Sequence, residues 1–99
     1  METIITRQMF VDNPKFYEII EEEINRTLGE TLNDFVECPT TYLRLFLSKV
    51  NATFLSPKME KKIIEILVKK HSFKENEITN VYKSSDTFPC VIVDINLDM

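Results

Sequence analysis

Apolar residues recur at three- and four-residue spacing over residues 57–70, and this pattern predicts a helix with one apolar side. Both ends of the helix are marked. Ser56 is suited to cap the first turn, and Pro57 lies where a missing N–H costs nothing. Lys69 and Lys70 fall at the negative end of the helix dipole. The expected inner stripe consists of Met59, Ile63, Ile66 and Leu67, widened by Ile64 and Val68. An apolar side of this width is typical of a helix that lies flat on a sheet.

A second helix is predicted over about residues 14–28 from the same periodicity. Asp12 or Asn13 would cap it, with Pro14 in its first turn. Gly29, the only glycine, is suited to the left-handed conformation that ends many helices. The apolar positions of this helix are Tyr17, Ile20, Ile24 and Leu28, with Phe16 and Ile19 beside them.

Four further segments read as strands. Residues 3–11 are rich in β-branched and aromatic residues, and residues 31–37 suggest a short edge strand. Residues 78–83 and 90–97 also have strand composition, and the latter alternates clearly between two faces. We expect this last strand to lie at a sheet edge that is open to another chain.

Residues 41–50 fit two patterns. Leucine at every second position indicates a strand, entered through Pro39, which holds the preceding residue extended. The same segment also has a helical apolar face, formed by Leu43, Phe46, Leu47 and Val50. Periodicity does not separate the two, and we favour the strand because the segment is short.

With a strand at residues 41–50, the fold class is an α+β two-layer sandwich. The helices at about 14–28 and 57–70 would cover one face of a four- to five-stranded sheet. This order is similar to that of ferredoxin-like domains and, in its doubled strand–helix–strand plan, to tautomerase-type monomers. Tautomerases rely on an exposed N-terminal proline where this chain has Glu2, so the likeness covers element order alone and implies no activity.

If residues 42–50 are helical instead, the alternative is three helices followed by a C-terminal β-hairpin. This plan is winged-helix-like. The basic helix 57–70 would then lie where a recognition helix sits.

The length of 99 residues predicts a single domain spanning residues 1–99, and an apolar content of 43% is ordinary for a folded protein. No apolar run approaches the roughly 20 residues needed to cross a bilayer. The N-terminus has neither the basic start nor the apolar run of a signal peptide. We therefore expect an intracellular protein, cytoplasmic or, if viral, in the host cytoplasm, with no membrane partner.

Charge is unevenly distributed along this acidic chain, whose net charge is −4. Residues 1–37 hold nine acidic and three basic residues, whereas residues 38–83 hold four acidic and nine basic ones. Such polarity can steer a charged partner or orient self-association. The candidate interaction surface comprises the outward charged residues of the two helices: Lys58, Lys61, Lys62, Lys69, Lys70, Glu18, Glu21 and Glu22.

Residues with catalytic or metal-binding chemistry are few. His71 is the only histidine, and Cys38 and Cys90 form no CxxC pair, so a zinc site would need carboxylates as well. We expect both cysteines to be reduced thiols in a reducing compartment. The Asp94–Asp98 segment matches the opening of a calcium loop, but the required glycine and distal glutamate are absent. We predict no catalytic residue, metal, cofactor or small-molecule ligand.

The sequence therefore favours a small non-catalytic protein–protein interaction module, such as an adaptor, an assembly factor or an inhibitor of a larger machine. It would act on a protein partner or by self-association. The alternative is a nucleic-acid-binding protein that uses the basic helix 57–70.

Overall fold

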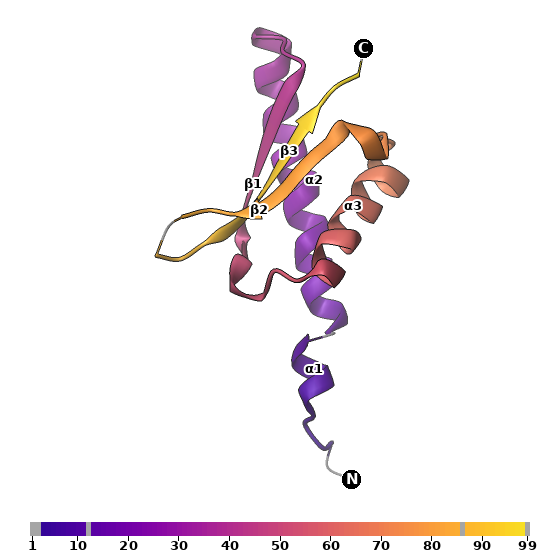
Figure 1. The fold of residues 1–99 in the computed structure, drawn as a ribbon, viewed down its shortest axis with the longest axis vertical. Helices are drawn as coiled ribbons and strands as arrows, with labels where there is room; N and C mark the ends of the chain where they lie inside the picture. The colour runs from indigo at the N-terminus through magenta and orange to yellow at the C-terminus, as the bar shows by residue number, and fades with distance from the viewer. Residues whose placement is uncertain (1–2, 12, 86, 99) are drawn as a thin grey trace.

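The computed structural model describes residues 3–11, 13–85 and 87–98, and it has an α+β fold (Figure 1). Its elements are α1 (Arg7–Val11), α2 (Pro14–Glu37), β1 (Tyr42–Asn51), α3 (Pro57–His71), β2 (Ile78–Lys83) and β3 (Cys90–Asn96). The three strands form an antiparallel sheet in the order β1-β3-β2. In Figure 1 the strands lie in front of α2, and α3 lies beside α2 on the same side of the sheet.

Both predicted helix starts are confirmed. The Ser56 hydroxyl accepts a hydrogen bond from the backbone N–H of Met59 at 3.3 Å. The Asn13 side chain accepts one from the N–H of Lys15 at 3.0 Å. The left-handed residue that ends α3 is Ser72, with φ of 60°. Asp12, the other candidate cap, lies outside the described residues.

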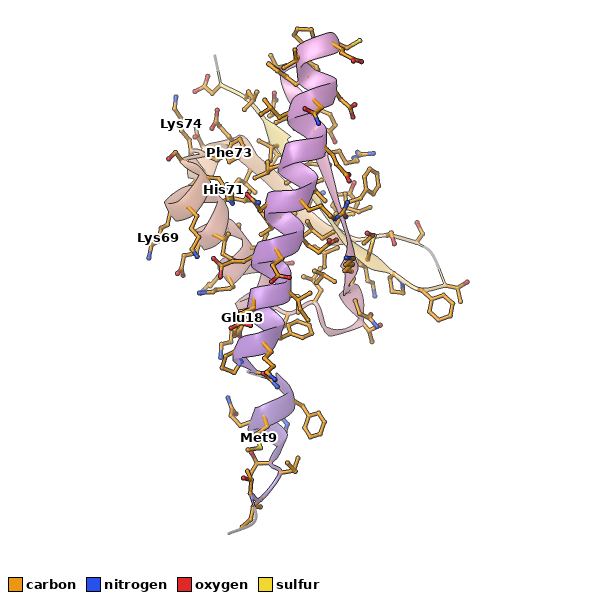
Figure 2. All side chains as sticks on the ribbon, turned by 180° about the vertical axis from the view of Figure 1, so that it is seen from behind. Met9, Glu18, Lys69, His71, Phe73 and Lys74 are labelled. Carbon is orange, nitrogen blue, oxygen red and sulfur yellow. The ribbon has the colours of Figure 1, made fainter. Side chains whose placement is uncertain are left out.

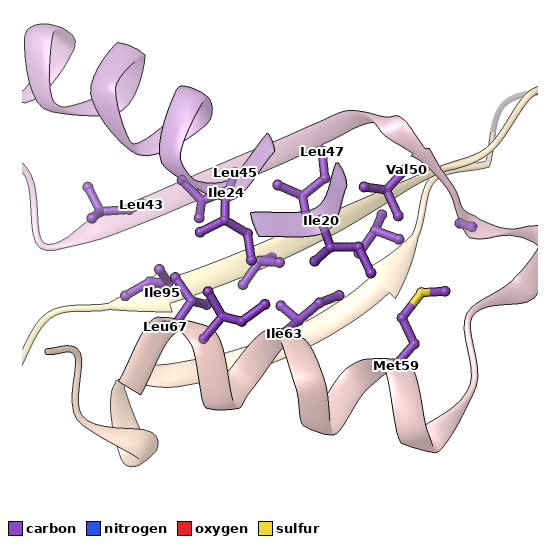
Figure 3. Packing of buried hydrophobic residues seen from close by; sticks show 14 residues of the cluster. Ile20, Ile24, Leu43, Leu45, Leu47, Val50, Met59, Ile63, Leu67 and Ile95 are labelled. Atoms are coloured by element: carbon purple, nitrogen blue, oxygen red, sulfur yellow. The ribbon is translucent and has the colours of Figure 1, made fainter. Parts of the chain in front are cut away.

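The core lies between the sheet and the two long helices (Figure 3). Alternate residues of β1 and β3 point into it, among them Leu45 and Val93, both fully buried. The expected inner stripe of α3 is buried, and Ile20 and Ile24 of α2 complete the layer. The segment 41–50 is therefore a strand, as favoured, because every second side chain meets a helix-covered face.

A buried carboxylate fastens α2 to the far end of β1. The side chain of Glu23 is bonded by Arg26 at 2.7 and 3.0 Å and by the backbone N–H of Lys49 at 3.0 Å. These bonds lower the pKa of Glu23, first through Arg26, against an opposing effect of burial. Here the pairing of β1 with β3 shifts register between Leu47 and Asn51, so Glu23 bonds a part-buried N–H beside this irregularity.

The strand predicted over residues 3–11 is wrong. Arg7–Val11 form the short helix α1, and residues 3–6 belong to no element. Ile4 and Ile5 are 80% and 67% exposed. A strand needs a neighbour for its backbone groups, and α1 extends from the body at the start of α2, away from the sheet (Figure 1).

The edge strand predicted over residues 31–37 is also wrong, because α2 continues through Gly29 to Glu37. Leu28, Thr31 and Phe35 follow one another at three- and four-residue spacing and line one groove beside Leu43. This packing outweighs the weak helix propensity of a single glycine. Gly29 has no left-handed φ, so it does not end the helix.

The sheet consequently has three strands among the described residues, not four or five. Without a first strand, the ferredoxin-like order and the doubled strand–helix–strand plan are absent. The winged-helix-like alternative fails at residues 42–50, although its C-terminal β-hairpin is present as β2–β3. β3 is the central strand rather than an edge, because β1 and β2 pair with its two sides.

Candidate interaction surface on the open sheet face

One face of the sheet is covered by α2 and α3, and no described helix or strand packs on the other. Figure 2, seen from behind, has α2 in front of the strands, which places the uncovered face on the side seen in Figure 1. Strand alternation assigns the side chains to this face, because Leu43, Leu45 and Leu47 occupy the core side of β1. We call the uncovered side the open sheet face; it includes Tyr42, Arg44, Phe46, Asn80, Tyr82, Ile92, Asp94 and Asn96.

A polar network lies at the centre of the open sheet face. Arg44 Nε donates to Asp94 Oδ1 at 2.9 Å across the β1–β3 pair. Arg44 Nη2 donates to the Tyr42 hydroxyl at 2.7 Å, and the guanidinium lies 5.5 Å from the Tyr42 ring centroid. These contacts raise the pKa of Arg44, mainly through Asp94. The guanidinium is therefore charged and held in one orientation before any partner arrives.

Tyr82 of β2 lies on the same face, directly across from Ile92 of β3. Desolvation raises the pKa of its phenol, and the Asp94 carboxylate raises it further. Tyr82 therefore stays neutral at physiological pH, and its hydroxyl can donate a hydrogen bond.

Apolar side chains surround this network. Phe46 is 52% exposed and Tyr42 is 44% exposed, whereas Ile92 between β1 and β2 is buried. Tyrosine, phenylalanine and arginine are the residue types enriched in the buried centres of protein interfaces. An aromatic surface with its polar groups already oriented can bury area against a partner with little loss of side-chain freedom.

The predicted charged surface lies elsewhere, on α2 and α3, and much of its charge is paired within the chain. Lys70 is paired with Glu21 across the two helices. The ammonium groups of Lys62 and Lys69 each lie 3.7 Å from Glu65 Oε1 on α3. The Lys62 ammonium also lies 5.7 Å from the Tyr17 ring centroid. The contrast between an acidic and a basic helix is thus partly neutralised where they meet.

The other four members of that surface are exposed, and Lys58 and Lys61 border the same hollow as Lys62 and Tyr17. Lys58 and Lys61 lie near the start of α3. Glu18 and Glu22 lie on α2, and Figure 2 shows Glu18 on α2 and Lys69 on α3. As an interaction surface, this set of residues stays a prediction.

The cysteines and the histidine are not brought together as a reactive cluster. Cys38 is exposed after the end of α2, and Cys90 is half-buried at the start of β3. His71 borders an apolar groove, and Figure 2 shows it near Phe73 beside α2. Across residues 3–11, 13–85 and 87–98, no three histidine, cysteine or acidic side chains lie close enough to hold a metal ion.

Comparison with protein-family models, with curated proteins and with solved structures finds no match to this chain. Within the part of the chain that the structure describes, no helix combines the length and the apolarity needed to cross a membrane.

The sequence contains a signal for the open sheet face, but the predicted interaction surface included only charged residues of the two helices. Tyr42, Arg44 and Phe46 alternate with the leucines of β1, so they must share the opposite face once that segment is a strand. Whether a helix covers that face depends on tertiary structure. Residue spacing alone does not show which positions remain exposed.

Proposed function

We propose that this protein is a non-catalytic protein–protein interaction module that docks through the open sheet face. The observation that carries the proposal is the pair of exposed aromatic side chains, Tyr42 and Phe46, flanking the oriented Arg44–Asp94 ion pair. A partner that covers Tyr42 and Phe46 would bury apolar area, and the Arg44 and Asp94 side chains would not have to be ordered on binding.

Charge favours a protein over a nucleic acid as the occupant of this face. The Arg44 guanidinium on this face is balanced by the buried Asp94 carboxylate, and the chain carries a net charge of −4. Phosphate binding needs unpaired cations, whereas Arg44 is engaged with Asp94 and several α3 lysines are engaged with glutamates. Nucleic-acid binding through α3 is the alternative that the experiment must separate.

The test is affinity capture from source cells with the tagged parent and three variants, read by mass spectrometry and by nucleic-acid staining. Phe46→Ser removes one of the two exposed aromatic side chains of the open sheet face. Phe88→Ser is the matched control, because Phe88 is 89% exposed and lies outside the strands, between β2 and β3. Lys58→Glu with Lys61→Glu tests α3.

We expect the parent, the Phe88 variant and the α3 variant to retain the same protein partner and the Phe46 variant to lose it. Far-UV circular dichroism of all four proteins controls for folding. Equal capture by the Phe46 and Phe88 variants contradicts the proposal. Capture of nucleic acid that disappears in the α3 variant favours the alternative.

A further inference from the structure

The outer edge of β1 is open for pairing. β3 lies on only one side of β1, and no described strand pairs with the other side. The N–H of Leu97 donates to the carbonyl of Thr41, which fixes the odd-numbered residues of β1 as the hydrogen-bonded partners of β3. The backbone N–H and C=O groups of Arg44 and Phe46 therefore point outward, away from β3.

The open edge of β1 ends at Ser48 and Lys49, where side chains of α2 bond the strand. The Glu23 carboxylate occupies the N–H of Lys49, and Arg26 Nη2 donates to Ser48 Oγ at 3.3 Å. The register shift after Leu47 also ends regular pairing. An added strand could therefore pair along residues 42–47.

The side of α2 that overlooks this edge is acidic. Glu23 and Arg26 place it beside Ser48 and Lys49, and Glu30 continues it by pairing with Arg26 at 2.7 Å. Asp34 and Glu37 lie four and seven residues after Glu30, on the same side of the helix, and both are exposed. We call Glu30, Asp34 and Glu37 the acidic flank.

The acidic flank runs along part of the open edge. From Glu30 to Glu37 the helix advances about 10 Å, and the open edge of β1 covers about 17 Å from Tyr42 to Leu47. The two elements run in opposite directions and are joined by the short connection after Glu37, and Figure 1 shows β1 in front of the C-terminal part of α2. A strand added beyond β1 would have one face under this flank and the other beside Phe46.

We propose that the β1 edge binds an extended peptide segment of another protein in which apolar and basic residues alternate. Main-chain hydrogen bonds to Arg44 and Phe46 would hold the segment. Its apolar side chains would lie on the open sheet face, and its lysine or arginine side chains would meet the acidic flank. This inference rests on the proposed function and specifies the chemistry of the partner.

The same charges argue against a second copy of the chain as the occupant. Pairing of two β1 edges about a two-fold axis would bring two acidic flanks to the same side of one continuous sheet. The like charges of the two acidic flanks would repel each other, whereas the acidic flank attracts a basic segment. The acidic flank therefore selects a heterologous partner.

The probe is a labelled synthetic peptide of about eight residues, enough to span the open edge, in which lysine and valine alternate. One control peptide replaces every lysine by glutamate, and another replaces a central valine by proline, which removes a backbone donor. Binding is measured by fluorescence polarisation and by chemical-shift changes of the backbone amides. We expect the lysine–valine peptide to bind and to shift the amides of Arg44 and Phe46. We expect the proline control to bind more weakly and the glutamate control not to bind.

The charge contribution is tested with Asp34→Lys plus Glu37→Lys, against Glu18→Lys plus Glu22→Lys on the outer side of the same helix. Both changes have equal charge, and lysine near the end of α2 suits the helix dipole. At low salt we expect about a tenfold loss of lysine–valine peptide binding in the first variant, little change in the second, and a smaller difference at high salt.

Equal losses in the two variants, binding of the glutamate peptide by the parent, or shifts confined to α3 would overturn the proposal. A stable dimer paired through β1 would also overturn it. The proposed function fails separately, because Phe46→Ser would then leave capture of the natural partner unchanged.

Discussion

The buried carboxylate of Glu23 offers the sharpest test of how α2 is held to the sheet. Its side chain is 2% exposed and accepts bonds from Arg26 and from the backbone N–H of Lys49. Replacement by alanine leaves that part-buried N–H without its acceptor and removes one of the two carboxylates that hold Arg26. Arg26 keeps its contact with Glu30 at 2.7 Å, so it is not left without a partner.

The magnitude follows from these losses. An N–H left without its acceptor costs about 1–3 kcal/mol, and the lost charge-assisted bonds from Arg26 add about 1 kcal/mol because Arg26 keeps its pair with Glu30. We therefore expect Glu23→Ala to lower the free energy of unfolding by about 2–4 kcal/mol. For a domain of this size that is a fall in Tm of roughly 8–20 °C. Glu23→Gln retains an acceptor oxygen and should cost about half as much.

Urea unfolding at neutral pH, followed by circular dichroism, measures these differences. Glu22→Gln is the matched control, because Glu22 is the neighbouring carboxylate on the exposed side of the helix, and it should change stability by less than about 0.5 kcal/mol. Equal effects of Glu22→Gln and Glu23→Gln would refute the reasoning.

The same variants predict a pH dependence of stability. The folded protein holds the pKa of Glu23 below the ordinary value of 4.5, chiefly through its hydrogen bonds from Arg26. A carboxyl whose pKa is lowered on folding adds stability above its unfolded pKa, and that stability is lost as the pH falls through the folded value. The difference between the parent and Glu23→Gln should therefore be constant near neutrality and shrink below about pH 4.5.

Three further changes test other parts of the fold. Gly29→Ala should raise stability by about 0.5–1 kcal/mol, because an added methyl group meets nothing within 4 Å and alanine favours a helix; a lower Tm would contradict this. Glu77→Gln should speed hydrogen exchange at the amide of Asp98, which donates to the Glu77 carboxylate at 2.8 Å, and unchanged exchange would show that the bond does not hold the C-terminal segment. Leu45→Ala should lower the free energy of unfolding, measured in urea, by about 2–5 kcal/mol, whereas Phe46→Ala on the exposed face should lower it by under about 1 kcal/mol. Similar losses in the two variants would mean that the two faces of β1 are wrongly assigned.

Local signals were sufficient where an element carries its own start, stop and apolar side. Residues 56–71 have a capping serine, a first-turn proline and an inner apolar stripe, and α3 forms at Pro57–His71 with those residues in those roles. The alternating residues of β3 likewise identified a strand, whereas the leucines of β1 also fitted a helical face, and only the short length of that segment favoured the strand. These patterns work because caps and periodicity concern neighbours along the chain.

Local signals failed where the outcome depended on distant neighbours. The β-branched residues at positions 3–6 have strand composition, but the described structure supplies no strand to pair with them. The spacing of Leu28, Thr31 and Phe35 was helical all along, yet the packing beside Leu43 decides that the helix passes Gly29.

The sequence alone determined an α+β chain with a capped amphipathic helix, strands with two distinct faces and an uneven distribution of charge. Tertiary structure decided which face of the sheet stays uncovered, which strand lies at its edge, and which lysines are paired with glutamates. The physical reason is that exposure and pairing are relations between segments far apart in the chain. Periodicity shows that Phe46 and Leu45 point in opposite directions, but only the position of α2 shows which one is buried.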